Sequence, residues 1–293
     1  MEGLSHRWGF YFAIERGSDG IGARDLEAVI GMMKRTSGWT HNIFTNLGSK
    51  GIQSVNTEHQ ERNAAIATNS ISKAILARWV VFQTFIEVAK ELVQEGKFHG
   101  KIQRDWLLFQ ILPLVPIDGV DPFSAFIKET LSSVVTGVLD ALLCQFSPNR
   151  VLGPSFDFDS NRDSFFYVID EAQVAGKTYM GAFGDTVPRP VLRPIIQEMT
   201  SAEGIASVKI IVSGTGFSLA LFKTAMASGI GKDATHFDVV HTTGDFSDRD
   251  TQSHYISCYL PPSFLSSESG TYLRTRVYDW LRGRYVATKA SRR

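Results

Sequence analysis

The sequence predicts an α/β fold with a mainly parallel sheet, because short apolar strands alternate with amphipathic helices along the chain. Two apolar runs carry this prediction, at residues 165–169 (FFYVI) and 208–212 (VKIIV). Both are rich in β-branched or aromatic side chains, as expected for buried strands of such a sheet. Helical spacing of apolar residues precedes and follows each run, so we expect helices on both faces of the sheet.

The first of these runs ends on two adjacent carboxylates, Asp170 and Glu171. Ligands of open α/β sheets bind at the carboxyl edge, where such a strand ends. A buried strand that stops on Asp-Glu is the pattern of a Walker B strand in a P-loop NTPase. In that strand the Asp holds Mg²⁺, and the Glu orients and deprotonates the attacking water. The alternative interpretation is a core strand followed by a solvated acidic turn.

The composition excludes several classes of protein. The 293 residues include 30 basic and 30 acidic side chains, and a net charge of zero argues against a general binder of nucleic acid or of membrane surfaces. No apolar run approaches the ~18 residues of a membrane span, and no signal peptide is visible. We therefore expect a cytoplasmic protein. Cys144 and Cys258 lie far apart in apolar-periodic stretches, which predicts buried free thiols.

The N-terminal segment has the layout of a phosphate-binding loop. The aromatic residues in 8–14 predict a strand, and Gly17 and Gly22 follow at the G-x-x-x-x-G spacing before a helical pattern. These glycines are candidate phosphate-binding residues. Ala23 and Arg24 stand where a P-loop needs Lys and Ser or Thr, so a Walker A motif here would be degenerate. An ordinary strand-to-helix turn is the alternative.

Residues 60–147 are predicted to form a large helical insertion ahead of the Asp-Glu strand. Apolar residues recur at gaps of three and four from about residue 61 to 95. A second long helix is predicted to start at Asp121-Pro122, as cap and first residue, and to end before Ser147-Pro148. We interpret the aromatic and leucine stripes of these helices as core.

The second strand ends on Ser213-Gly214-Thr215-Gly216. A small polar residue at this place predicts a sensor, in which Ser213 or Thr215 would bind the γ-phosphate or the lytic water. A glycine turn with a helix cap is the alternative. Further on, residues 242–293 are predicted to be mainly helical and rich in arginine. Arg284 is a candidate arginine finger, although such arginines also form solvated basic faces.

Taken in order, these segments resemble fungal P-loop ATPases related to the AAA and STAND classes and to the ATPase modules of Crinkler-type effectors. The resemblance covers nearly the whole chain. The segments that carry it are Ala77-Arg78-Trp79 and residues 106–110 (WLLFQ), 168–173 (VIDEAQ), 189–194 (RPVLRP), 213–216 (SGTG), 243–246 (TGDF), 259–262 (YLPP) and 281–284 (LRGR). It implies binding of ATP and Mg²⁺, with Asp170 on the metal and Glu171 as the base.

The resemblance also implies that part of the machinery is missing. Members of this kind carry an intact Walker A motif upstream of a strand like residues 9–14, so on that alignment the chain begins after the P-loop. We therefore expect residues 1–241 to be an incomplete P-loop NTPase-like core and residues 242–293 to be the start of a helical, lid-type region. The expected function is a truncated or degenerate ATPase-like domain that binds ATP–Mg²⁺ weakly or not at all.

Two further expectations concern partners and folding. Besides nucleotide, the resemblance implies an unidentified protein partner and assembly into homo-oligomers. The alternative is a non-catalytic interaction module that keeps the fold and uses its long helices as a surface. If an upstream strand is missing, residues 208–212 should have an unpaired edge and the chain should be poorly soluble. A rival arrangement, with residues 8–14 beside residues 208–212, predicts a well-folded domain.

Overall fold

The structure is a computed structural model. It describes residues 6–15, 22–47, 52–97, 101–114, 119–153, 156, 158, 163–185, 187–201, 208–214, 222, 248–257 and 260–281. The chain divides into two compact units, Met1–Ala234 and Thr235–Arg293. Each unit is described by itself.

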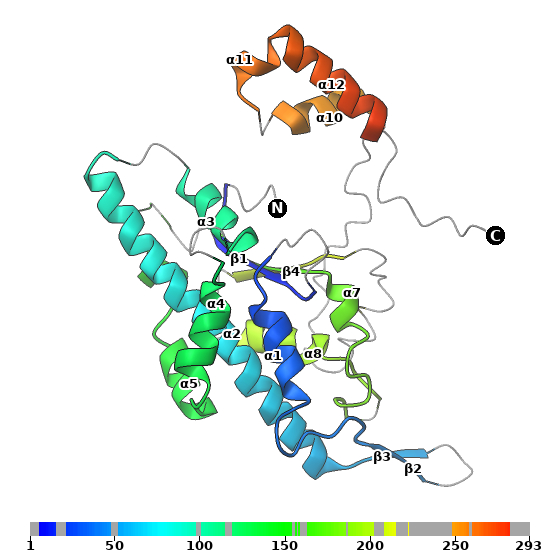
Figure 1. Ribbon diagram of the computed structural model, residues 1–293. Coiled ribbons are helices and arrows are strands. Elements are labelled where there is room, and N and C mark those ends of the chain that lie inside the picture. Colours follow the sequence, from blue (N-terminus) through cyan, green and yellow to red (C-terminus); the bar gives the residue numbers. More distant parts are fainter. Residues whose placement is uncertain are drawn as a thin grey trace, which may run out of the picture. The chain divides into compact units, whose positions relative to one another are not determined.

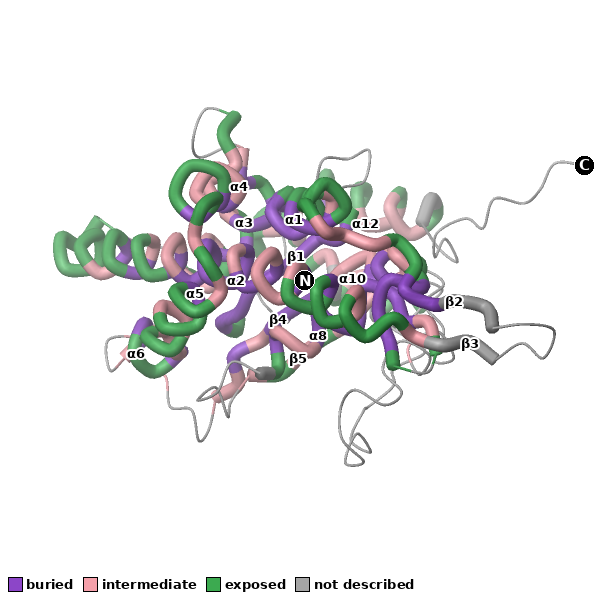
Figure 2. The backbone as a smooth tube through the Cα atoms, turned by 90° about the horizontal axis from the view of Figure 1, so that it is seen from below, coloured by how far each residue is buried: buried purple, intermediate pink, exposed green. Residues whose placement is uncertain are grey.

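The first unit is built on a parallel sheet of three strands, β1 (Gly9–Ala13), β4 (Phe165–Asp170) and β5 (Val208–Val212), in the order β1-β4-β5 (Figures 1 and 2). Ala13 pairs with Asp170, and Ile169 pairs with Val212, so the three carboxyl ends meet at one edge. The predicted α/β class with a parallel sheet is confirmed.

The two faces of the sheet pack against different helices, because successive side chains of a strand point to opposite sides. Phe10, Phe12 and Tyr167 lie in the main core, together with residues of α1 (Asp25–Met33), α2 (Thr57–Gln94) and α8 (Leu192–Ser201). Tyr11, Ala13 and Val168 pack against Leu107 and Ile111 of α3 (Ile102–Ile111). Helices therefore cover both faces, as predicted.

Strand order corrects one prediction from the sequence. β4 lies between β1 and β5, so the rival arrangement with residues 8–14 beside residues 208–212 is wrong. Strand β5 is also less buried than predicted, since Ile211 is 44% exposed while every residue of β1 is buried. Both strands pair with β4 alone among the described strands, but α3 covers the free edge of β1.

The free edge of β1 is closed by a side chain of α3. Gln110 accepts a hydrogen bond from the Tyr11 amide at 2.9 Å and donates one to the Gly9 carbonyl at 3.2 Å. These are the two bonds that a further strand would make to an edge strand. Trp106 adds a hydrogen bond from its Nε1 to the same Gly9 carbonyl at 2.8 Å. The amide of Gln110 thus stands in for the backbone of a neighbouring strand.

The long helix α2 is the centre of the first unit. The Asn56 side chain caps it by accepting from the His59 amide at 3.0 Å. Its buried side contacts α1, α4 (Pro122–Phe126), α5 (Thr136–Leu143) and α8 (Figures 1 and 2). Trp79 of α2 donates to the hydroxyl of Tyr167 on β4 at 3.1 Å, and burial raises the pKa of this tyrosine well above its ordinary value. Helix and sheet are therefore joined through an aromatic core.

The predicted helix from Pro122 to residue 146 is interrupted. Asp121 caps its start as predicted, but α4 passes into a π-helical turn, η3 (Ile127–Leu131), and α5 begins only at Thr136. The break falls on residues 132–135 (SSVV), which have low helix propensity. Side chains of α2 stabilise it, since Lys73 donates to the Ser132 carbonyl at 3.0 Å and Asn69 to the Val134 carbonyl at 3.3 Å.

The remaining elements of the first unit are short. Strands β2 (Phe44–Leu47) and β3 (Ile52–Val55) form an antiparallel ribbon, α6 (Pro148–Leu152) follows α5, and α7 (Ala172–Ala175) follows β4. Cys144 is exposed, so the prediction of a buried thiol is wrong for this residue, while Cys258 lies outside the described residues.

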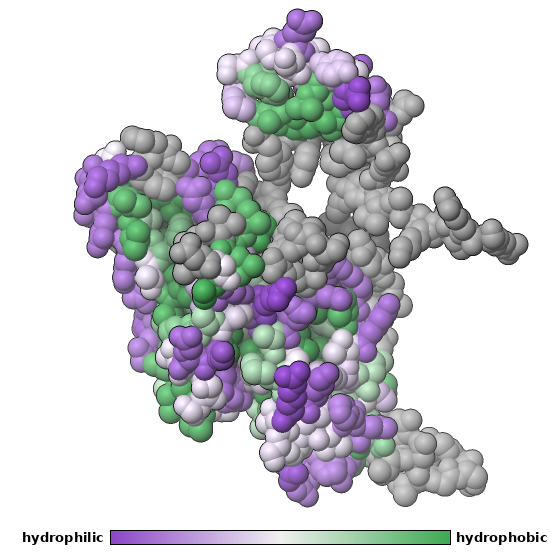
Figure 3. All heavy atoms as spheres, viewed as in Figure 1, coloured by the Kyte–Doolittle hydropathy of each residue, from purple (hydrophilic) through white to green (hydrophobic). Residues whose placement is uncertain are grey.

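The second unit contains α10 (Arg249–Ser257), α11 (Pro262–Leu265) and α12 (Glu268–Leu281), and its helical character was predicted. Helices α10 and α11 both contact α12. Figure 3 shows hydrophobic side chains beside polar ones on the visible face of this unit. In the part of the chain that the structure describes, no helix has the length and apolar character needed to cross a bilayer.

Candidate functional site

The carboxyl edge of the sheet brings together two residues that the sequence predicts separately. Asp170 is the last residue of β4, and Ser213 directly follows β5. The Ser213 hydroxyl donates to Asp170 Oδ1 at 2.7 Å. Two backbone bonds fix this serine, from its amide to the Ile169 carbonyl at 2.8 Å and from the Ala172 amide to its carbonyl at 2.9 Å. Ser213 therefore holds the carboxylate of Asp170 in one orientation.

A second hydroxyl on the same carboxylate was not predicted. Tyr11 of β1 donates to Asp170 Oδ2 at 2.5 Å, and its side chain is buried. Tyr11 pairs with Val168, two residues before Asp170, so both side chains lie on one face of the sheet. The sequence does contain a signal, since Tyr11 is the hydroxyl-bearing residue of an otherwise apolar strand, but its partner depends on strand register.

Glu171 marks the sharp turn that leaves the sheet. Its backbone is left-handed, with φ 55° and ψ 34°, an uncommon conformation for a residue with a side chain. The side-chain amide of Gln173 donates a hydrogen bond to Glu171 Oε2. Asp170 and Glu171 are thus adjacent in sequence but engage different partners. Gly214, which follows Ser213 after the neighbouring strand, packs closely against this turn. A Cβ at this position would lie 1.9 Å from Gln173 Oε1, so the close approach requires glycine.

Of the four residues predicted to bind nucleotide, the structure describes only Gly22. Gly22 is described, with φ +93°, and a Cβ on it would lie 2.7 Å from the Cβ of Ala13. Its amide donates to the Ile111 carbonyl at 2.8 Å, so this N–H is already used within the protein. Gly17, Thr215 and Arg284 lie outside the described residues. Their predicted roles stay predictions.

The site could supply one carboxylate to a metal ion whose other ligands are mostly water molecules. Among the described residues, no group of three or more His, Cys, Asp or Glu side chains could hold a metal by itself. Each Asp170 oxygen accepts one hydroxyl, which leaves a lone pair on each for a metal-bound water. Mg²⁺ typically takes one or two carboxylates, with water and phosphate oxygens as its other ligands. Asp170 fits this mode of binding.

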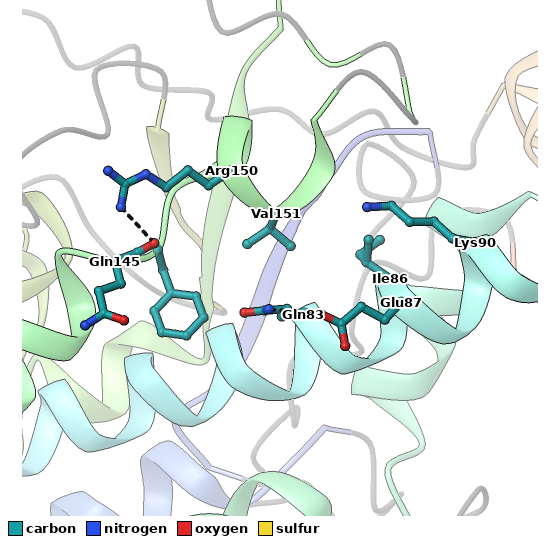
Figure 4. A pocket seen from close by; sticks show the side chains of 8 residues that line it. Gln83, Ile86, Glu87, Lys90, Gln145, Arg150 and Val151 are labelled. Carbon is teal, nitrogen blue, oxygen red and sulfur yellow. Dashed lines mark hydrogen bonds between the residues drawn. The ribbon is translucent and has the colours of Figure 1, made fainter.

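The first unit also has a groove away from this edge. This groove of about 190 Å³ runs between α2, the end of α5 and α6 (Figure 4). Arg150 at its rim donates to the carbonyls of Cys144 and Gln145, at 3.3 and 3.2 Å, and so caps the end of α5. None of the residues that line the groove belongs to the carboxyl edge of the sheet.

No family model matches the chain, and neither a curated protein nor a solved structure matches it. The functional interpretation therefore depends on the geometry around Asp170.

Proposed function

We propose that the carboxyl edge of the sheet binds Mg²⁺ together with a nucleoside triphosphate, as in a P-loop ATPase-like domain. The observation that supports the proposal is the hydrogen bond between Ser213 and Asp170, which joins the ends of two neighbouring parallel strands. A metal-binding aspartate and a sensor residue must lie close together at the ends of neighbouring strands. The sequence pattern indicates the same two residues for these roles. Glu171 follows directly, at a turn that takes it away from the sheet.

The residues divide the work as follows. Asp170 would bind and orient a water of the metal, while Tyr11 and Ser213 keep its carboxylate from rotating. Glu171 would accept a proton from the attacking water, and the side-chain amide of Gln173 positions its carboxylate. When bound, Mg²⁺ neutralises charge on the phosphate oxygens.

We expect weak binding. A P-loop Lys is absent at Ala23, and the Gly22 amide is held by Ile111. Charge-assisted hydrogen bonds contribute about 1.5–3 kcal/mol each, so the loss of a few lowers affinity about a hundredfold or more.

The test is a titration of the 293-residue chain with Mn²⁺ in the presence and absence of ATP, followed by electron paramagnetic resonance. We expect ATP-dependent Mn²⁺ binding that Asp170→Asn weakens about tenfold or more, as for the loss of about 1.4 kcal/mol. Asp140→Asn is the matched control, because Asp140 is an exposed carboxylate on α5. Equal binding by the wild type and Asp170→Asn would refute the proposal, and so would the absence of any ATP-dependent binding.

A second variant separates the role of Glu171 from metal binding. Glu171→Gln should abolish any ATP hydrolysis while leaving ATP-dependent Mn²⁺ binding within about threefold of the wild type, a difference below 1 kcal/mol. Unchanged hydrolysis in this variant would remove Glu171 from the mechanism.

A further inference from the structure

The second unit contains a pocket of about 170 Å³, lined by residues of that unit. It lies between the first turns of α10 and the N-terminal half of α12. The residues that give it its chemistry are Arg249, Asp250, Ser253, Thr271, Arg274 and Thr275. Two cations, one carboxylate and three hydroxyls thus face a single small space.

Neither guanidinium in the pocket is neutralised within the described residues. Arg249 donates to the Thr275 hydroxyl at 3.2 Å. Arg274 donates to the Ser253 hydroxyl at 3.4 Å and to the Leu265 carbonyl at 3.3 Å, and its buried Nε has no hydrogen-bond partner. All of these acceptors are neutral. A guanidinium has five N–H donors, so both side chains keep donors for an anion.

Two further features favour an oxyanion. Arg249 and Asp250 lie in the first turn of α10, a helix of nine residues, where unpaired backbone N–H groups carry partial positive charge. Ser253 and Thr271 also line the pocket, and their hydroxyl groups can donate to phosphate oxygens. Arginine forks match the geometry of such oxygens well.

Asp250 restricts the kind of anion that the pocket can bind. A carboxylate repels a fully deprotonated anion but accepts a hydrogen bond from an anion that keeps a proton. Inorganic phosphate keeps at least one proton at neutral and mildly alkaline pH, whereas sulfate has none. Phosphate monoesters lose theirs above a pKa of about 6. We propose that this pocket binds inorganic phosphate, with the two arginines and the hydroxyls on its oxygens and its proton shared with Asp250.

The test is a titration of the ¹⁵N-labelled full chain with inorganic phosphate at about pH 8 and constant ionic strength, where phosphate monoesters are dianions. The arginine Nε–Hε resonances report the site. We expect saturable binding that Arg274→Gln weakens about tenfold or more, since a charge-assisted, forked contact is lost. Arg276→Gln is the matched control, because Arg276 lies on the same helix and donates to the Tyr272 hydroxyl instead. It should change affinity less than about twofold.

Titrations with other anions and with further variants show which groups of the ligand and of the protein determine binding. Sulfate and a phosphate monoester such as AMP should bind the wild type more weakly than phosphate, and Asp250→Asn should remove this preference. Arg274→Lys, which keeps the charge and loses the fork, covers the case in which Arg274→Gln fails to fold, and it should also weaken binding. Equal losses in the Arg274 and Arg276 variants, or equal affinity for phosphate and sulfate, would overturn the proposal. Asp170→Asn should leave this site unchanged, so the two proposals fail separately.

Discussion

Asp25 begins α1 and Asp170 ends β4, and the surroundings of these two aspartates differ in kind. Arg78 binds both oxygens of Asp25 at 2.7 Å, and both side chains are 0% exposed. Asp170 is half-buried and is held by two neutral hydroxyls, from Tyr11 and Ser213. A fully buried carboxylate whose charge is neutralised by a guanidinium is not available to bind a ligand. A carboxylate that is oriented but not neutralised can bind a cation.

The surroundings of Asp25 show why that pair is structural. The Arg78 guanidinium also donates to Gln110 Oε1 at 3.1 Å and lies over the ring of Phe123 at 3.9 Å. Gln110 in turn closes the edge of β1. One network therefore joins α1, α2, α3 and the sheet. The contrast predicts that substitutions in this network mainly change stability and that substitutions around Asp170 mainly change binding.

The largest effect should follow Arg78→Met. It leaves the Asp25 carboxylate buried without a counter-ion, which destabilises by about 3–5 kcal/mol. Urea unfolding followed by tryptophan fluorescence measures the loss. The double variant Arg78→Met with Asp25→Leu should recover part of the stability, because no buried charge remains. A loss below about 1 kcal/mol, the range of exposed ion pairs, would contradict the structural role.

Gln110→Leu should have the next largest effect. It removes the partner of the Tyr11 amide and of one Arg78 N–H, and each buried donor left unsatisfied costs about 1–3 kcal/mol. Gln110→Glu sharpens the test below about pH 4, where the carboxylic acid is largely neutral, since its C=O keeps the acceptor and its O–H replaces the donor to Gly9. It should therefore be the milder variant in the same unfolding assay. The reverse order would show that Gln110 does not act as a substitute strand.

Tyr11→Phe should lower stability by about 1 kcal/mol, the usual net contribution of one hydrogen bond. Its effect on ATP-dependent Mn²⁺ binding should be smaller than that of Asp170→Asn, because Ser213 still orients the carboxylate. Combining it with Ser213→Ala should lower affinity by more than the product of the two single effects, since either hydroxyl alone can hold Asp170. Strictly multiplicative effects would show that the hydroxyls act independently.

The smallest effect on stability should follow Asp170→Asn, within about 1 kcal/mol, because an amide oxygen still accepts a hydroxyl and no counter-ion is orphaned. Asp25→Asn is the matched comparison and should destabilise severalfold more in the same urea titration, since it leaves Arg78 buried and unpaired. Similar losses in the two variants would break the distinction between the two aspartates.

Local patterns in the sequence were sufficient for the class of fold and for part of the site. Buried strands that alternate with helices predict the parallel sheet, and Asp121 before Pro122 predicts a cap, because these features depend on neighbouring residues. The end of a strand also fixes where its next residues lie. The sequence therefore predicts Asp170 and Ser213 at the ends of two strands, and the structure brings their side chains into contact.

Tertiary structure alone decided which distant residues meet. Tyr11 and Asp170 are 159 positions apart, and Arg78 and Asp25 are 53 apart, so no local pattern indicates either contact. The order β1-β4-β5 and the break at residues 132–135 also depend on what packs beside them. Sequence periodicity specifies which face of a helix or strand is apolar. The partner of each polar group depends on register and packing, which only the folded chain defines.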